Sequence, residues 1–271
     1  MRQRRSKFLA FAGLAAGLVV AAVPAATSAQ EPAAASVTLV HGVRGLIADI
    51  WLDGALALAA FEPERTTDAL AIPAGPHTVE VRTAGAAPES TPVVSANVDL
   101  PAGAQLSAVV HLAQDGSPTV TLYPDDVSQV PAGEARVVVR HAAAAPPIDV
   151  DLDGAPLAAA LPNSGQAGTA TGPGSHTIAV ALEGAPAPAL PPQDVPIAEG
   201  SSTILYLVGS ASDNSLVWLA QQRSGVQTAP TAVRSGTDGL AVPGSFPMVA
   251  VLLLGAVVIV SATRLVVAWR R

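Results

Sequence analysis

The sequence predicts an all-β fold that consists of two tandem β-sandwich modules. Aromatic residues make up 3% of the 271 residues and charged residues 13%, whereas the chain holds 23 glycines and 24 prolines. This much glycine and proline disfavours a helical bundle, and the apolar content is too high for an acidic disordered chain. A three-part signature also occurs twice, about one hundred residues apart, which indicates a duplicated module.

The spacing between the two copies of the signature is nearly constant. It is 100 residues from His41 to Gly54 and 99 residues at His77, so a single deletion separates these points. The first copy comprises Val40-His41, residues 49–54 and residues 73–81, and the second comprises Arg140-His141, residues 149–154 and residues 172–180.

Short strands joined by turns account for the first module, residues 36–123. Its clearest element is a hairpin at Asp53-Gly54, because an Asp-Gly pair between two strand-like runs supplies the positive φ that both central residues of a type I′ turn need. Turns spaced roughly 8–12 residues apart favour a sandwich of the immunoglobulin-like or transthyretin-like kind. The expected strands are 37–40, 48–52, 56–61, 69–72, 77–82, 92–100, 105–112 and 119–123.

A linker, residues 124–134, leads to a second module, residues 135–222, which repeats the scheme with its hairpin at Asp153-Gly154. Residues 223–245 are rich in Gly, Ser, Thr and Pro without periodicity, which predicts a flexible stalk. The expected strands of the second module are 135–141, 148–152, 157–161, 175–182, 193–197, 203–209 and 215–220.

The first 29 residues have the three parts of a secretory signal peptide. Residues 1–7 contain four basic side chains, residues 8–23 are apolar, and a run of small residues ends at Ala29. This order predicts export with cleavage after Ala29. A retained N-terminal anchor is the alternative.

An apolar run near the C-terminus predicts one transmembrane helix, residues 246–268. Residues 246–263 carry no charge, and about 20 residues are enough to cross a bilayer core. Trp269 fits the headgroup level, and the terminal arginines predict a cytoplasmic tail, residues 269–271. The pentapeptide that covalent cell-wall sorting requires is missing. We therefore expect a single-pass protein of the cell membrane with its N-terminal ectodomain outside and its C-terminus in the cytoplasm.

The segment between the two ends is strongly acidic. It holds all 21 acidic residues and seven of the 14 basic residues, which gives a net charge of −14. Nucleic-acid binding needs clustered Lys and Arg, so this charge disfavours a nucleic-acid partner. The chain has no cysteine, which excludes disulfides and thiolate metal sites, and each core must be held together by burial alone.

Four stretches of the first copy, residues 40–41, 49–54, 70–82 and 98–103, resemble a bacterial family known as domain of unknown function 4397. The second copy keeps His141-Ala142 and Pro146-Pro147, part of the stretch that the family carries before its hairpin, whereas the first copy departs there with Gly42-Val43-Arg44-Gly45. The resemblance covers both copies, about residues 36–222. It implies an exported, surface-displayed β-rich module and no established activity. The alanine-rich composition is typical of actinobacterial proteins.

Asp149, Asp151 and Asp153 match the opening of an EF-hand calcium loop. That loop needs Glu at its twelfth position, where Ala160 stands, and the first copy has Trp51 in place of the middle aspartate. On a strand the same alternation puts the three carboxylates on the solvent face. The sequence favours this solvated strand, with a weak surface calcium contact as the alternative.

Four of the five histidines recur in pairs, His41 with His141 and His77 with His176, whereas His111 has no counterpart. None has the close spacing of zinc ligands. His77 and His176 each follow a Gly-x pair and open a strand, which predicts a ring that is hydrogen-bonded to a loop backbone. We expect no metal and no cofactor.

Catalytic signatures such as Gly-x-Ser-x-Gly, His-Glu-x-x-His or a cysteine nucleophile are missing, so we expect no enzymatic activity. The sequence predicts a structural or adhesive cell-surface protein whose modules bind an envelope polymer or a surface protein. A ligand- or glycan-binding sensor that works with a separate membrane partner is the alternative. The candidates for surface binding are Arg44, Trp51, Asp149, Asp151 and Asp153.

Overall fold

The computed structural model describes residues 33–226, and this part of the chain forms β-strands joined by turns. The all-β prediction is confirmed for this range. No helix in it is long and apolar enough to cross a membrane. The predicted signal peptide, membrane helix and tail, and most of the predicted stalk, lie outside the described residues.

The first module has two sheets. One has the order β4-β1-β8-β9, with β5 also pairing with β1, and the other has the order β3-β2-β6-β7. The strands are β1 (Ala35–His41), β2 (Ala48–Leu52), β3 (Ala55–Phe61), β4 (Arg65–Thr66), β5 (Leu70–Ile72), β6 (Gly75–Thr83), β7 (Val94–Leu100), β8 (Gln105–Leu112) and β9 (Pro118–Pro124).

The second module also has two sheets, with the orders β13-β10-β16-β17 and β12-β11-β14-β15. Its strands are β10 (Ala135–Ala144), β11 (Ile148–Leu152), β12 (Ala155–Leu161), β13 (Gln166–Thr171), β14 (Gly174–Leu182), β15 (Pro188–Ile197), β16 (Ser201–Ser210) and β17 (Val217–Ser224).

Each module contains one parallel strand pair at the centre of a sheet. β1 runs parallel to β8 with Val40 opposite Val109, and β10 runs parallel to β16 with Arg140 opposite Tyr206. The two modules therefore share one topology. The common register makes Val40 equivalent to Arg140 and Val109 equivalent to Tyr206.

The Asp-Gly hairpin is confirmed in both copies. Asp53 and Gly54 have φ angles of 51° and 77°, and Asp153 and Gly154 have φ angles of 53° and 77°. Positive φ at both central residues is the type I′ geometry, whose twist matches that of the flanking strands. The hairpins join β2 to β3 and β11 to β12.

Each module has its own apolar core between its two sheets. A fully buried aliphatic side chain contributes roughly 1.5–3 kcal/mol by leaving water. Because the chain has no disulfides, these clusters supply most of the stabilisation. Val37, Ile50, Val81 and Val110 belong to the first core, and Val137, Ile148, Val180 and Leu205 belong to the second.

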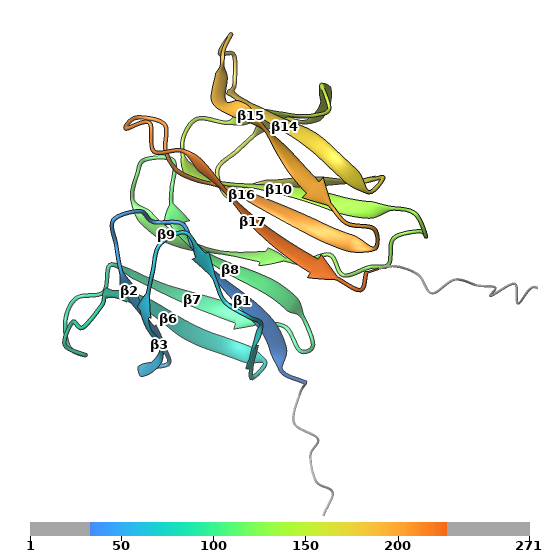
Figure 1. Ribbon diagram of the computed structural model, residues 1–271. Coiled ribbons are helices and arrows are strands. Elements are labelled where there is room, and N and C mark those ends of the chain that lie inside the picture. The colour runs from blue at the N-terminus through green and yellow to red at the C-terminus, as the bar shows by residue number, and fades with distance from the viewer. Residues whose placement is uncertain (1–32, 227–271) are drawn as a thin grey trace, which may run out of the picture. The chain divides into compact units, whose positions relative to one another are not determined.

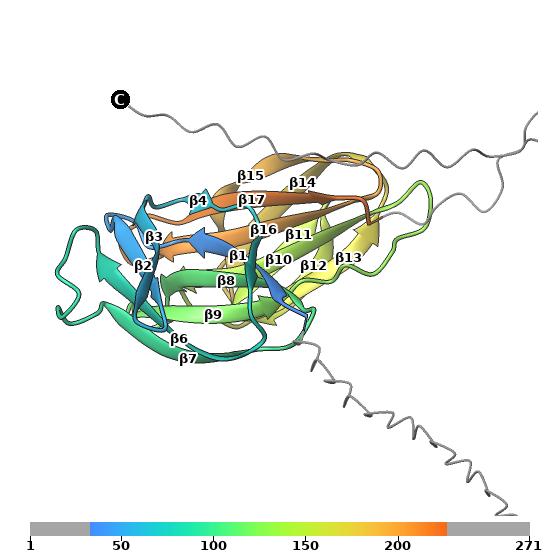
Figure 2. The same ribbon diagram turned by 90° about the horizontal axis from the view of Figure 1, so that it is seen from below.

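The two modules pack against each other through a third apolar cluster, which draws residues from β1, β8 and the end of β9 on one side and from β10 and β16 on the other. Figure 1 shows the strands in four layers, with β1 and β8 facing β16 and β17 in the middle, and Figure 2 shows the same neighbours from below. All ten residues of β16 are buried, because one face lies on its own module's core and the other faces the first module.

Three strands differ from the sequence-based expectation, and the shortest of them is β4, a two-residue strand that the sequence does not predict. The sequence predicts no strand between residues 161 and 175, yet β13 forms there. It lacks long apolar side chains, so it shows no strand pattern, but its backbone pairs with β10 over six residues without a break. β15 begins at Pro188 instead of Gln193, which an edge strand tolerates because its outward N–H groups need no partner.

Candidate functional site

The duplicated hairpin is held by an aspartate–histidine pair in each module. His77 Nδ1 donates to Asp53 Oδ2 at 2.6 Å, and its Nε2 donates to the Pro73 carbonyl at 2.8 Å. The other carboxylate oxygen, Asp53 Oδ1, accepts from the Thr78 N–H at 2.8 Å. This contact between the histidine ring and a loop backbone confirms the sequence-based prediction.

The second module repeats the arrangement. His176 Nδ1 donates to Asp153 Oδ2 at 2.6 Å, and its Nε2 donates to the Gly172 carbonyl at 2.9 Å. Because both ring nitrogens face oxygen acceptors, the protonated ring is favoured, and the hydrogen bond to Asp153 raises the pKa of His176 above its usual value. The hydrogen bond from His176 in turn lowers the pKa of Asp153.

The first aspartate of the signature also has a structural role. Asp149 Oδ1 accepts from the Ala160 N–H at 2.8 Å, and Asp49 Oδ1 accepts from the Ala60 N–H at 2.7 Å. Ala160 and Ala60 both have positive φ, at register shifts in β12 and β3. The carboxylates therefore stabilise strained bulges instead of facing water freely, which corrects the expectation that all three aspartates of the signature are simply solvated.

The described residues contain no group of three or more His, Cys, Asp or Glu side chains placed to hold a metal ion. Asp153 is tied to His176, Asp149 is tied to a backbone N–H, and Asp151 is exposed on the outer face of β11. Hydrogen bonds within the hairpin therefore hold two of the three carboxylates of this stretch.

The remaining histidines are buried. His41 and His141 bond the carbonyls of Leu46 and Pro146 through Nε2, and burial lowers the pKa of both rings. Burial lowers the pKa of His111 further, to about 4, so this ring is neutral at physiological pH. All three act as uncharged core groups with satisfied hydrogen bonds.

Trp51 lies on the outer face of β2, beside Glu80 of β6. The guanidinium carbon of Arg82 is 5.8 Å from the centre of the indole ring, and Arg82 Nη2 donates to Glu80 Oε2 at 2.7 Å. The indole is partly exposed, while Arg82 is only 7% exposed. Tryptophan, arginine and glutamate therefore form one packed unit on this face.

The second module has a surface cavity at the position that corresponds to Trp51. Asp151 stands where Trp51 does, and Ala179 and Ala181 replace the glutamate and the arginine. These small side chains leave a cavity of about 170 Å³, which Asp149 and Pro188 also line. The outer faces of the two modules have thus diverged.

Arg44 lies at the junction between the modules. Its Nη1 donates to the Ser215 carbonyl of the second module at 3.1 Å, and its Nε lies 2.6 Å from Glu64 Oε1. Arg44 therefore contributes to module packing, a role that its position in a loop does not indicate.

The junction faces of the modules are complementary in size. Equivalent positions carry small residues in the first module and large ones in the second: Val40 against Arg140, Ser107 against Ile204, and Val109 against Tyr206. A Cβ atom on Gly42 would lie 2.7 Å from Val208 Cγ1, so this close approach requires glycine. Duplication followed by divergence has produced two different surfaces that fit together.

A buried ionic cluster lies at the centre of the junction. Asp125, which directly follows β9, is 2.7 Å from Arg140 Nη2 through Oδ1 and 2.6 Å from Arg223 Nη2 through Oδ2. Ser107 Oγ also donates to Asp125 Oδ1 at 2.9 Å. The side chains of Asp125 and Arg140 are each 1% exposed. A buried carboxylate with this many donors is fully paired.

Tyrosine rings complete the cluster. The guanidinium carbon of Arg140 lies 4.7 Å from the ring centre of Tyr123 and 5.3 Å from that of Tyr206. Arg140 Nη1 donates to Tyr206 Oη, which in turn donates to Gln221 Oε1 at 2.7 Å. Burial raises the pKa of Tyr206, so it remains a neutral donor. Arg140 thus lies within cation–π distance of both tyrosine rings and also donates a hydrogen bond to one of them.

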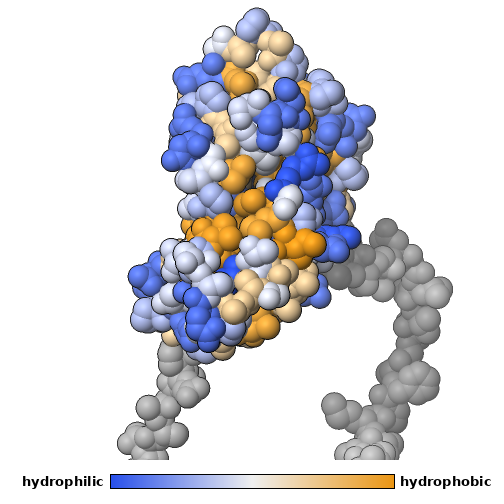
Figure 3. Space-filling view, turned by 90° about the vertical axis from the view of Figure 1, so that its left-hand side faces the viewer, coloured by the Kyte–Doolittle hydropathy of each residue, from blue (hydrophilic) through white to orange (hydrophobic). Residues whose placement is uncertain are grey.

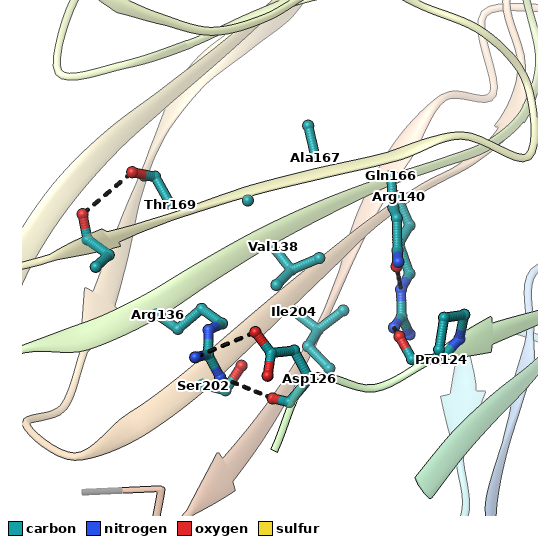
Figure 4. A pocket seen from close by; sticks show the side chains of 12 residues that line it. Pro124, Asp126, Arg136, Val138, Arg140, Gln166, Ala167, Thr169, Ser202 and Ile204 are labelled. Carbon is teal, nitrogen blue, oxygen red and sulfur yellow. Dashed lines mark hydrogen bonds and ion pairs between the residues drawn. The ribbon is translucent and has the colours of Figure 1, made fainter. Parts of the chain in front are cut away.

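A groove of about 390 Å³ runs beside this cluster, along the part of the β10–β13–β16 surface that the first module does not cover. Figure 4 shows Val138 and Ile204 between Arg136 and the Arg140–Gln166 pair. Arg136 Nη2 pairs with Asp126 Oδ2 at 3.1 Å, so the charged groups of the groove are already paired. The groove therefore offers no unpaired charge to a ligand.

A second cleft lies where loops of both modules meet. It measures about 530 Å³, and its walls include Asp115 and Gly116 from the first module and Pro146, Leu182 and Ala211 from the second. Figure 3 shows that apolar residues gather at mid-height on the face it views, between more hydrophilic regions above and below.

Sequence reasoning missed the ionic cluster. It assigns Asp125 to a linker and treats Arg140 only as part of the repeated signature. The available signal was the exchange of an apolar Val40 for a charged Arg140 at equivalent positions of otherwise apolar strands.

The family model described as "Domain of unknown function (DUF4397)" matches residues 35–151. The match covers the first module, the linker and the first two strands of the second module, so the chain resembles that family. No curated protein matches the chain.

Two solved structures show a slight likeness. One is the crystal structure of CBMbc (family CBM26) from Eubacterium rectale Amy13K in complex with maltoheptaose, with a TM-score of 0.24, 10% identity, and coverage of 72% of this chain and 98% of that chain. The other is SGBP-B of the Bacteroides ovatus mixed-linkage glucan utilization locus in complex with a mixed-linkage heptasaccharide, with a TM-score of 0.16, 11% identity, and coverage of 76% and 68%. At these TM-scores the likeness carries no conclusion about this chain.

Proposed function

We propose that the chain is a cell-surface structural or adhesive protein, which binds an envelope polymer or a surface protein without catalysis through its paired modules. In this proposal the signal peptide exports the chain, and the helix at residues 246–268 holds the modules outside the membrane. The acidic ectodomain favours a neutral or cationic partner.

The observation that carries the proposal is the buried junction centred on Asp125 and Arg140. An apolar cluster and a paired ionic cluster join the two sandwiches, and on this ground we expect them to move as one body. A rigid body keeps its loops and grooves in a fixed arrangement, which reduces the entropy lost when a large partner binds. The buried polar side chains of this junction, Asp125 and Arg140, bond each other. Their role in holding the modules together suits a binding scaffold.

Sedimentation with wall material tests the proposal. Residues 30–245 are mixed with purified actinobacterial cell-wall particles, and the bound fraction is measured against protein concentration. We expect saturable binding that falls at least tenfold in Asp125→Asn, because the fixed arrangement is lost, and that stays unchanged in Asp126→Asn, whose carboxylate is exposed. Wall particles that retain no protein at any concentration would contradict the proposal.

The partly exposed indole of Trp51 favours a second candidate function, a glycan-binding sensor module. An aromatic ring on the outer face of a sheet can stack against a sugar ring. In that case defined oligosaccharides would raise the unfolding temperature of the parent chain but not that of Trp51→Ala. Equal responses of the two proteins would exclude Trp51 as the contact.

A further inference from the structure

The edge strands of the described sheets differ in how well they are protected against pairing with another chain. An unprotected edge presents a row of free N–H and C=O groups, and proteins block such edges with charges, prolines, bulges or breaks. Within residues 33–226, seven of the eight edges have such a feature: β3 and β12 have bulges, β9 and β15 have prolines, β7 and β17 have a charge, and the edge formed by β4 and β5 is broken.

The eighth edge, β13, has none of these features. Its sequence, Gln-Ala-Gly-Thr-Ala-Thr, contains no charge and no proline, and its register with β10 is unbroken from Gln166 to Thr171. The residue in the middle of β13 is Gly168, which has no side chain to cover the edge. The equivalent edge of the first module is interrupted between Thr66 and Leu70, so the open edge is particular to the second module.

The register shows which backbone groups of β13 are free. The His141 N–H donates to the Gly165 carbonyl, so the bonded positions of this antiparallel pair are the odd-numbered residues of β13. The N–H and C=O groups of Gln166, Gly168 and Ala170 therefore point away from β10. The Ala170 carbonyl accepts only a long contact, 3.3 Å, from the Thr169 hydroxyl.

The groove beside β13 adds space for side chains. Five of the six residues of β13 line it, together with Val138 and Ile204 on its floor (Figure 4). The β13 positions opposite Val138 and Arg136 are Gly168 and Ala170, which fill little of its 390 Å³. Because Arg136 and Arg140 are paired with aspartates, the groove suits an uncharged side chain.

We propose that β13 is a docking edge for an extended segment of a partner polypeptide, which adds a strand to the sheet and places a bulky uncharged side chain in the groove. This inference rests on the proposed binding function and names the class of partner. Backbone hydrogen bonds supply affinity in such strand addition, and the pocket for alternate side chains supplies specificity. A second copy of the chain fits less well, because the middle of its own β13, residues 167–170, offers only small side chains to the groove.

Fluorescence anisotropy with a synthetic peptide tests the inference. The full-length chain in mild detergent is titrated against a labelled, capped peptide, Lys-Thr-Val-Thr-Leu-Thr-Val-Thr-Lys, and against a control peptide with proline in place of the leucine. We expect saturable binding of the first peptide and at least tenfold weaker binding of the second. Exchanging leucine for alanine should weaken binding about tenfold, because a small side chain leaves the groove empty.

Variants at Ala170 supply the matched control. Ala170→Pro removes an outward N–H without breaking a bond to β10, and Ala170→Lys places a charge on the edge, so each should weaken peptide binding at least tenfold with unchanged thermal unfolding. Ala170→Ser keeps the N–H and should bind like the parent chain. Equal binding by all four chains, or no saturable binding of the leucine peptide, would overturn the inference.

Two further outcomes are distinguishable. Self-association of the chain without peptide, if abolished by Ala170→Pro, would overturn the choice of occupant in favour of a second copy. A chain that binds cell-wall particles but no peptide would overturn this inference and leave the proposed function standing.

Discussion

The guanidinium of Arg140, in the second module, lies 2.7 Å from the carboxylate of Asp125, which directly follows the last strand of the first. Both side chains are almost completely buried, and Arg223 approaches the other carboxylate oxygen. Removing this carboxylate would leave two arginines without their counter-ion inside the junction.

The first prediction concerns this carboxylate. Asp125→Asn should lower the free energy of unfolding by about 3–5 kcal/mol, the typical cost of breaking a buried ion pair from one side. Urea denaturation of residues 30–245 measures it. Asp126→Asn, which weakens an exposed pair with Arg136, should cost less than about 1 kcal/mol. Similar losses of unfolding free energy in the two variants would show that the buried ion pair stabilises the chain no more than the exposed one does.

The second prediction concerns the close approach at Gly42. Gly42→Ala should destabilise the chain by about 1–3 kcal/mol, because the added Cβ would lie 2.7 Å from Val208 and the junction must shift to accommodate it. Gly172→Ala is the control, because a Cβ atom added there would have nothing within 4 Å. Calorimetric unfolding of both variants tests this prediction. An unfolding temperature of Gly42→Ala equal to that of the parent chain would contradict the junction geometry.

The third prediction concerns the hairpin histidines. Their hydrogen bonds to Asp53 and Asp153 raise the pKa of His77 and His176 above 6.5. A raised pKa in the folded state gives stability that is fully present below pH 6.5 and is lost as the pH rises through the folded pKa. The double variant His77→Gln, His176→Gln should therefore differ most from the parent chain near pH 5.5 and least near pH 9. Urea denaturation across this range measures the difference, and a gap independent of pH would contradict the assignment.

The fourth prediction has the opposite sign. Burial lowers the pKa of His111 from 6.5 to about 4, so the unfolded chain takes up a proton first as the pH falls between these values. The folded state should lose about 3 kcal/mol over this window from His111 alone. The stability difference between the parent chain and His111→Gln should shrink correspondingly from pH 7 to pH 4. A constant difference would show that the pKa of His111 is the same in the folded and the unfolded chain, and would contradict the assignment.

The local elements were predictable because their causes are local. An Asp-Gly pair specifies its own turn, and the positive φ angles at Asp53 and Asp153 follow from those two residues alone. His77 could also be assigned to a loop contact, because its partner carbonyl lies four residues earlier. The all-β class followed from the spacing of such turns.

The junction could not be predicted in the same way. The contact of Ser107 with Tyr206 joins residues 99 positions apart and depends on which faces of two sandwiches meet. The exchange of Val40 for Arg140 marks a changed surface, but the pattern of residues in one strand does not say which face of the other module that surface meets. β13 was missed for a related reason, because its pairing with β10, and not its side chains, makes it a strand.

The fit between small residues on β1 and β8 and large residues on β10 and β16 has a consequence for the evolution of the array. Each module has a single surface of this kind, and the two surfaces cover each other. A third copy inserted in tandem would find neither the small face nor the large one available. Pairing through these faces is therefore limited to two modules, as in a dimer with a single shared interface. A longer protein of this design would have to add modules in pairs.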